Sequence, residues 1–412
     1  MSVPTTTVEV VFDETPVLSG DAFTLDDSEM GVLNNPYFLL DGHLDFKDVS
    51  ADVQASKVSR GRSRQLDKYA AGAATIDFVS TTRKYDPLNE SSPYYPYVTP
   101  RRYVRIRTNG VAVFAGLINT WSMSYDLTGL TYMSASASDS TTLLANQLLT
   151  EYTPDVELTG TRINTIFARP EIDFTATAVS IDAGTSTLGA FLIPADTNAL
   201  GYLRQIEKSE QGYLFASAND TFTFKDRSTV LAQIGSVSFK DDGTGTSDYM
   251  TLDVETGDEL LFNRIVAQSV GAGVAQVATD ATSISEYDIS TLEATDLLNK
   301  ATGEVASIAD LLLQQYKTPE IRFTGISQQL WAMSGVNQNL LLDLDLTDLA
   351  TVTKTYSTGS PLSVTKYVLV EGITHTITPQ SHIIGFRFAS LNESGFILDS
   401  GTFGLLDVGS VG

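Results

Sequence analysis

Alternation of apolar and polar residues over positions 60–121 is the feature that most constrains the fold. Ile76 and Phe78 lie two positions apart in a run of strand-forming residues, so both face the same side of a predicted strand. Further along, Asn109 and Gly110 form a dipeptide that is typical of a two-residue β-hairpin turn. The region therefore predicts linked antiparallel strands, and it carries no catalytic motif.

Two predicted strands, 101–107 and 111–118, flank this turn. Val104 and Ile106 alternate with arginines, which places the apolar side chains inward and the arginines outward. Gly116 falls inside the second strand, where a glycine indicates a bulge or a close backbone approach.

The rest of the chain predicts a mixed middle part and a second β region. A helix over 199–211 precedes a hairpin over 213–225, and a helix over 303–316 ends before Pro319. A short helix near 141–149 closes the first β part. Later strands have the spacing of a second antiparallel barrel or sandwich; they are 364–370, 373–377 and 382–388.

Three segments of the first part resemble the first barrel of tail hub proteins of long-tailed bacteriophages, also called baseplate hub or minor tail proteins. They are the G-R-S-R run that begins at Gly61, the A-G-A-A-T-I-D-F strand with its R-K-Y-D-P-L-N continuation, and the V-R-I-R…V-F-A-G-L-I hairpin. Shorter patterns extend the resemblance over roughly residues 20 to 410, and it is thin between 150 and 195.

This resemblance implies a mainly β protein with a few helices (α+β), in which two hub-type antiparallel β-barrels accompany a smaller α+β middle domain. The domains expected are 1–145 (first barrel), 146–247 (middle domain, which can be an insertion), 248–395 (second barrel with one helix) and 396–412 (C-terminal docking tail).

The resemblance also implies a structural role and not an enzymatic one. Hub proteins form homotrimers in which six similar barrels join the sixfold tail to a threefold tip. The partners implied are a distal tail protein, the tape measure protein and a tip or fibre protein, with DNA only as passing cargo. The location implied is the virion tail tip, after assembly in the host cytoplasm.

Composition bounds these expectations. The chain has 412 residues, 50 acidic against 26 basic residues, and no cysteine, so no disulfide or thiolate site is available. A net charge of −24 disfavours tight nucleic-acid binding and favours solubility. No apolar run approaches the ~20 residues that a spanning helix needs, and the N-terminal residues do not predict a secretory signal. We expect no stable membrane binding.

Ten residues are candidates for partner binding. Arg60, Arg62 and Arg64 alternate with small residues, so all three can point one way from a strand and pair with carboxylates of a neighbouring subunit; a solvated strand edge is the alternative. The tyrosine cluster can anchor a partner or stack on sugar, or can pack on its own barrel; it comprises Tyr94, Tyr95 and Tyr97.

The last four candidates belong to a short internal repeat, F-x-L-D-x3-(M/F)-G-x-L-(N/D), which occurs at 23–34 and 396–407. We expect both copies to dock their apolar residues in equivalent ways, unless the similarity reflects shared turn chemistry or chance. The C-terminal anchors are Phe396, Leu398, Phe403 and Leu406.

Catalytic, metal and cofactor sites are not predicted. His375 and His382 are in phase with apolar residues and can face each other on neighbouring strands, but no third ligand has metal-like spacing. The acidic segments 343–348 and 241–248 do not follow a calcium-loop pattern, and they indicate a strand and a turn respectively. No motif places a nucleophile, a phosphate loop or a dinucleotide site.

Three other functions stay open. A distal tail ring protein would form hexamers and lacks the helix-plus-hairpin middle. A tail-associated cell-wall hydrolase needs a carboxylate pair or nucleophile that nothing here singles out. A receptor-binding tip protein that recognises carbohydrate is the third.

Overall fold

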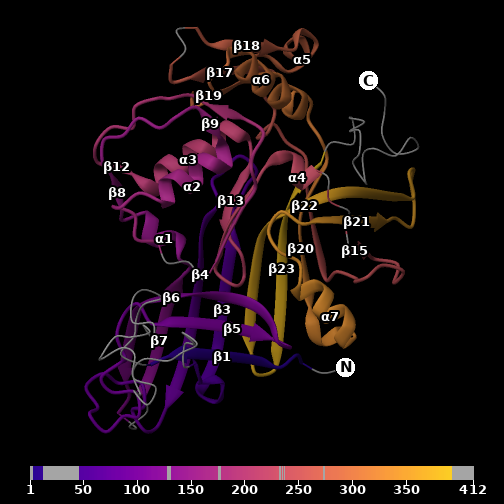
Figure 1. The fold of residues 1–412 in the computed structure, drawn as a ribbon. Helices are drawn as coiled ribbons and strands as arrows, with labels where there is room; N and C mark the ends of the chain where they lie inside the picture. The colour runs from indigo at the N-terminus through magenta and orange to yellow at the C-terminus, as the bar shows by residue number, and fades with distance from the viewer. Residues whose placement is uncertain are drawn as a thin grey trace.

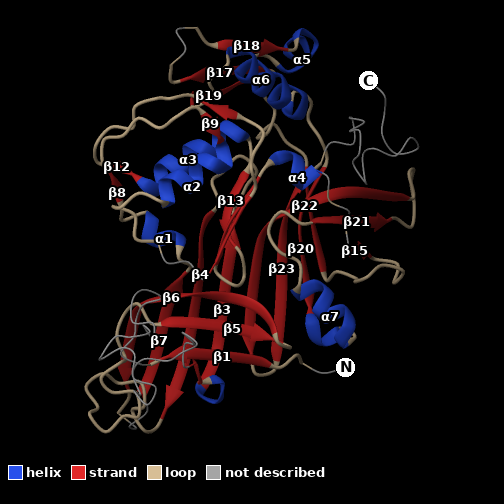
Figure 2. Cartoon of the chain, viewed as in Figure 1, coloured by secondary structure: helices blue, strands red, loops and turns tan. Residues whose placement is uncertain are grey.

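A long sheet of thirteen strands, antiparallel except for one parallel pair, forms the body of the protein. Figures 1 and 2 show its arrangement. The computed structural model describes residues 3–12, 46–127, 131–174, 178–231, 233, 235, 237–271 and 274–391. The strand order along the main path is β16-β20-β23-β22-β3-β4-β7-β6-β5-β1-β2, and β21 and β15 continue from β22 off that path. The chain is therefore mainly β with a few helices, as expected.

The sheet draws strands from both ends of the chain. The early strands are β1 (Thr6–Val11), β2 (Phe46–Asp48), β3 (Val53–Gly61), β4 (Ala70–Ser80), β5 (Tyr103–Thr108), β6 (Val111–Tyr125) and β7 (Thr131–Ser138). The late strands are β15 (Val237–Lys240), β16 (Thr251–Glu255), β20 (Arg322–Gln329), β21 (Leu349–Thr355), β22 (Ser363–Thr378) and β23 (Ser381–Ser390). Beside them lie the short helices η1 (Ser50–Asp52), α4 (Arg227–Leu231), η2 (Leu330–Ala332) and α7 (Gly335–Leu342).

The predicted hairpin of the first part is confirmed. Val104 and Ile106 of β5 are fully buried, and Asn109 and Gly110 adopt φ values of 50° and 82°, which make the tight turn into β6. A side chain at Gly116 would overlap the backbone of Ser138 on β7, so this glycine permits the close approach of two strands.

Two smaller units cover one end of the sheet (Figures 1 and 2). The middle unit contains α1 (Thr141–Leu144), β8 (Leu148–Leu149), β9 (Glu157–Leu158), α2 (Thr159–Phe167), β10 (Ala178–Ile181), β11 (Thr187–Leu188), β12 (Thr197–Asn198), α3 (Ala199–Glu210), β13 (Tyr213–Ala216) and β14 (Thr221–Lys225). The upper unit contains β17 (Arg264–Ser269), β18 (Gln276–Thr279), α5 (Ala281–Tyr287), β19 (Thr291–Leu297) and α6 (Thr302–Tyr316).

The helices follow from local sequence signals. The side chain of Asn198 accepts a hydrogen bond from the Gly201 amide and caps the start of α3, and the left-handed Gln211 is the C-cap of this helix. The apolar faces of α3 and α2 form the middle core. The inner face of α6 packs on β17 and β18 and forms a separate upper core.

Three expected elements differ from the structure. The predicted strands 364–370 and 373–377 are one strand, β22, because a register shift at Glu371 keeps the pairing with β23 unbroken. Residues 343–348 form a loop and not a strand, since the Asp348 carboxylate accepts a hydrogen bond from the Asp345 amide and folds the segment into a turn. The helix expected over 141–149 stops at Leu144.

The strand pairing adds detail to the expected domain boundaries, which stay a prediction. β15 lies in the segment assigned to the middle domain but pairs with β21 in the large sheet. The upper unit lies in the segment assigned to the second barrel but has its own sheet and core. Within the described ranges, no strand pairing between β1 and β3 closes the early strands into a ring. Closure into two barrels therefore stays a prediction.

The two halves of the sheet meet where β3 pairs with β22 in antiparallel register. Gly61, at the end of β3, has φ +95°, and an added Cβ would overlap the Glu371 carbonyl oxygen and lie 2.8 Å from the Gly372 Cα. Only glycine combines this left-handed conformation with this close approach. The position therefore fixes how the early and late strands join.

We predict that Gly61→Ala destabilises the protein by roughly 3–5 kcal/mol, because backbone strain and overpacking both act there. The control is Gly110→Ala, since Gly110 has a similar φ but open space around it, and strain alone should cost about 1–2 kcal/mol. Urea unfolding measures both. Equal losses for the two variants would contradict the close packing at Gly61.

Candidate interaction sites

Two of the three candidate arginines hold the halves of the sheet together. The Nε of Arg62 donates to the Glu371 carboxylate at 2.8 Å, and a second donor of the same guanidinium contacts its other oxygen. Both side chains are largely buried, at 14% and 3% exposed. Arg60 donates to Asp345 at 2.6 Å from a side chain that is 4% exposed. These arginines thus bind carboxylates of the late half of their own chain.

The surroundings of Arg62 favour its charged form. Its guanidinium lies over the ring of Tyr69 at 4.8 Å and near that of Tyr213 at 5.9 Å. Burial alone would lower the pKa of Arg62, but the facing Glu371 carboxylate outweighs it and raises the pKa above its ordinary value.

Arg64 is placed differently. The expectation that one strand presents all three arginines is wrong, because β3 ends at Gly61, where the left-handed backbone turns the chain away. The Arg64 side chain is 71% exposed and lies 4.0 Å from Glu259, which is also exposed. Pairing with a neighbouring subunit remains a prediction, and Arg64 is the arginine of the three with an exposed side chain.

The tyrosine cluster divides in the same way. The Tyr94 ring stacks on Phe12 with centroids 4.0 Å apart, and Tyr94 and Tyr97 both pack against the main core. Tyr95 is 43% exposed. The loop therefore packs on its own sheet through two tyrosines and leaves Tyr95 available to a partner.

The four C-terminal candidates, Phe396, Leu398, Phe403 and Leu406, lie outside the described residues, as do both copies of the F-x-L-D repeat. Their role stays a prediction from the sequence.

The two late histidines do face each other. His375 on β22 and His382 on β23 approach to 3.0 Å between Nδ1 and Nε2, and both are buried. Burial, and after it the neighbouring His382, lowers the pKa of His375; burial lowers that of His382 to about 4. The pair is therefore neutral near pH 7. Among the described residues, no group of three or more histidines and carboxylates could hold a metal ion.

The acidic loops are held by internal contacts. Asp241 binds Lys354 at 2.6 Å and caps the Thr355 amide, which fits the turn expected there. Asp345 binds Arg60, so the 343–348 segment contributes to the junction of the halves. No helix in the described part of the chain has the length and apolar character to cross a membrane.

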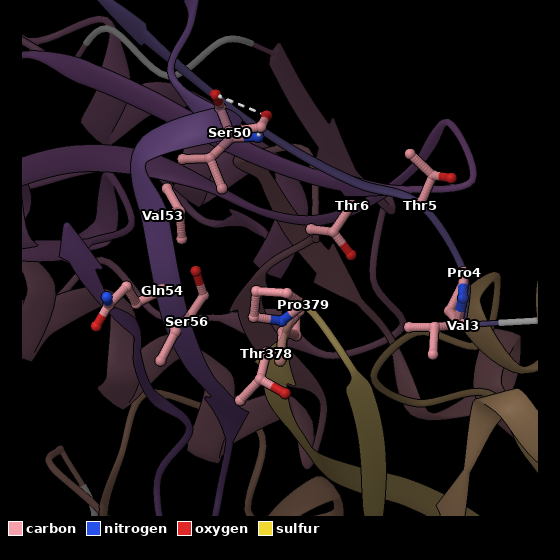
Figure 3. Close-up of a pocket in the computed structure, with 13 residues that line it drawn as sticks. Val3, Pro4, Thr5, Thr6, Ser50, Val53, Gln54, Ser56, Thr378 and Pro379 are labelled. Atoms are coloured by element: carbon pink, nitrogen blue, oxygen red, sulfur yellow. Dashed lines mark hydrogen bonds between the residues drawn. The ribbon is translucent and has the colours of Figure 1, made fainter. Parts of the chain in front are cut away.

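A pocket of about 290 Å³ opens between β1, the start of β3 and the β22–β23 turn (Figure 3). Its lining includes Thr5, which precedes β1, Thr6 of β1, and Gln54 and Ser56 of β3. These residues face Thr378 and Pro379 across the opening (Figure 3). None of its lining residues is acidic, basic or a histidine. The pocket therefore offers polar contacts but no general acid or base.

Sequence reasoning missed the partners of the junction arginines. Glu371 and Asp345 are 309 and 285 positions from Arg62 and Arg60, so no local pattern connects them. The available signal was an isolated glutamate inside an otherwise apolar strand, V-L-V-E-G-I. A buried carboxylate in such a place indicates a cationic partner.

We predict that Glu371→Gln lowers the free energy of unfolding by about 3–5 kcal/mol, because it leaves the buried Arg62 guanidinium without its counter-charge. Glu259→Gln is the matched control at the exposed Arg64 pair, where the loss should stay below about 1 kcal/mol. Urea midpoints of the two variants test this, and similar midpoints would show that the buried pair contributes no more than a surface contact.

Two solved structures share this arrangement of elements. The tail protein from Neisseria meningitidis MC58 superposes with a TM-score of 0.57 at 11% identity, over 84% of this chain and 94% of that protein. The 43 kDa tail protein of prophage MuSo2 from Shewanella oneidensis superposes with a TM-score of 0.53 at 12% identity, over 84% of this chain and 93% of that protein. No protein-family model and no curated protein matches the sequence. The chain therefore has the fold of these two tail proteins, in agreement with the resemblance of its sequence to tail hub proteins.

Proposed function

We propose that this chain is a structural hub protein at the distal tip of a phage tail. The observation that carries the proposal is the fold shared with two tail proteins over nearly their whole length. The hub-like sequence patterns at β3, β4 and the β5–β6 hairpin add independent support. These patterns concern residue types, whereas the similarity to the two solved structures concerns the path of the backbone.

In this proposal the protein forms a homotrimeric ring. Each subunit contributes an early and a late β half, so three copies present six β halves to the tail above. The ring joins the distal tail protein and the tape measure protein to a tip or fibre protein, and DNA passes without stable binding. Its place is the virion, after assembly in the host cytoplasm.

The described residues favour a structural role over a hydrolase. The pocket between β1 and β3 lacks acid–base groups. Asp139 and Asp220, two carboxylates with raised pKa, are 3% and 1% exposed, so a cell-wall polymer has no access to these two groups. A distal tail ring and a receptor-binding tip are the alternatives, and the number of copies separates the first of these from a hub.

We predict that the purified full-length protein sediments with the mass of three 44.5 kDa chains. Analytical ultracentrifugation over a concentration series measures this directly. Six copies would indicate a distal tail ring, and a monomer at all concentrations would contradict the hub proposal.

Arg64 and Tyr95 are the described candidates with exposed side chains, and we propose that they contact a neighbouring subunit or tail protein. Arg64→Glu should raise the dissociation constant of the trimer about three- to tenfold, because it replaces attraction to an acidic copy by repulsion. Lys57→Glu, on the exposed side of the preceding strand β3, is the matched charge reversal. Equal dissociation constants for the two variants would show that Arg64 is only solvated.

A further inference from the structure

Four aspartates gather where the tip of the β13–β14 hairpin meets the main sheet. We call them the carboxylate cluster: Asp139 follows β7, Asp220 lies in the hairpin turn, and Asp345 and Asp348 lie in the loop before β21. The hairpin belongs to the middle unit, whereas the other three belong to or adjoin the main sheet. The cluster therefore lies at a boundary between two packed units.

Direct hydrogen bonds cross this boundary. The Asp220 carboxylate accepts from the Ser140 amide at 2.8 Å and from the Tyr103 hydroxyl at 3.3 Å. The Ala218 amide donates to Asp345 at 3.3 Å in the other direction. Asp220 is 1% exposed, so its carboxylate is out of water while the tip is docked.

Asp139 acts on Asp220 directly, and further charged groups lie along the same boundary. Asp139, itself 3% exposed, accepts from the Gly72 and Thr141 amides. On the main sheet, Arg60 binds Asp345, and Lys225 at the base of the hairpin lies 3.8 Å from Asp348. Four carboxylates thus have two basic side chains between them. Asp139 and Asp220 are the two that are almost fully buried, whereas the side chains of Asp345 and Asp348 are 28% and 32% exposed.

Protonation of one carboxylate would remove part of this excess negative charge. Burial, and after it the negative charge of Asp139, raises the pKa of Asp220 to about 7, although the hydrogen bonds from Ser140 and Tyr103 act the other way. Burial also raises the pKa of Asp139 and of Asp348. Once the tip leaves the sheet, Asp220 enters water and regains an ordinary pKa near ~4.

We propose that docking of the β13–β14 tip on the main sheet takes up one proton at the Asp139–Asp220 pair, so that the tip is held in acid and loosens as pH rises to about 7. The direction of this pH dependence follows from the linkage between proton binding and docking. A carboxyl whose pKa is higher in the docked state than in the undocked state binds its proton more tightly when the tip is docked. This proton stabilises docking fully below the pKa of the undocked state, and the stabilisation is lost as pH rises through the pKa of the docked state. With one proton involved, the docking equilibrium should weaken about tenfold per pH unit between roughly pH 5 and 7 and level off above 7.

Hydrogen exchange of the full-length protein tests this without relying on the proposed tail function. The amides of Ser140 and Ala218 donate across the boundary, so their protection reports docking of the tip. We would measure peptides that span these residues between pH 5.5 and 8.5, relative to the intrinsic exchange rate at each pH. Wild-type protection should fall about tenfold or more up to pH 7 and then stay level.

Asp220→Asn keeps the acceptor for Ser140 but cannot ionise, so the fall in protection up to pH 7 should be much smaller than in wild type. Asp226→Asn removes one charge directly after the hairpin, between β14 and α4, at a carboxyl whose pKa is lowered, and it should behave as wild type. Asp139→Asn should retain the pH-dependent fall in protection but shift it to lower pH. This variant tests the influence of Asp139 on Asp220 even if Asp220→Asn folds poorly. Protection that is independent of pH in wild type, or that falls equally in Asp220→Asn, would overturn the proposal.

Discussion

The pairing of β3 with β22 is the constraint on which the rest of the structure depends. It converts two runs of strands, from opposite ends of the chain, into one sheet with a shared core. A backbone ladder alone would allow slippage by two residues without turning any side chain to the wrong face. The Gly61 contact and the buried Arg62–Glu371 pair fix a single register, because both fit in only one alignment of the two strands.

The β13–β14 hairpin is the second joining element. Tyr213 and Phe215 lie against the main core, whereas Leu214, Phe222 and Phe224 belong to the middle core. Arg204 of α3 also donates to the Tyr69 carbonyl, which ties the middle unit to the segment after β3. The middle unit is therefore attached through apolar side chains on one face of a hairpin and through polar groups at its tip, and these two kinds of contact respond differently to pH.

Much of the fold could be predicted from the sequence because local signals were strong. Period-two alternation identified β4 and β5, Asn109-Gly110 identified the turn, and the apolar stripes of α3 and α6 identified both long helices. Prediction failed where a local signal had two readings. Glu371-Gly372 looked like a break between strands but is a bulge within β22, and alternation in 343–348 suggested a strand where side-chain hydrogen bonds make a turn.

The candidate sites were predictable only in part, for the same reason. The basic character of residues 60–64 was visible in the sequence. The carboxylates that bind Arg60 and Arg62 are about 300 positions away, so the sequence around the arginines does not indicate them. The facing histidines were predictable because their strands are neighbours in sequence. Exposure, which separates Arg64 and Tyr95 from their neighbours, depends on tertiary packing and could not be derived from alternation.

The distance in sequence between β3 and β22 has a consequence for how the protein is made. At about 5–20 residues per second, a ribosome needs roughly 15 to 60 s to synthesise the 309 positions that separate Arg62 from Glu371. During that interval β4 can cover one side of β3, but the side meant for β22 has no partner in the nascent chain. An unpaired strand edge of this kind invites association with other chains. The β3 edge of a nascent chain thus stays open to association until β22 has been made, and truncation ahead of β22 would leave that edge open permanently.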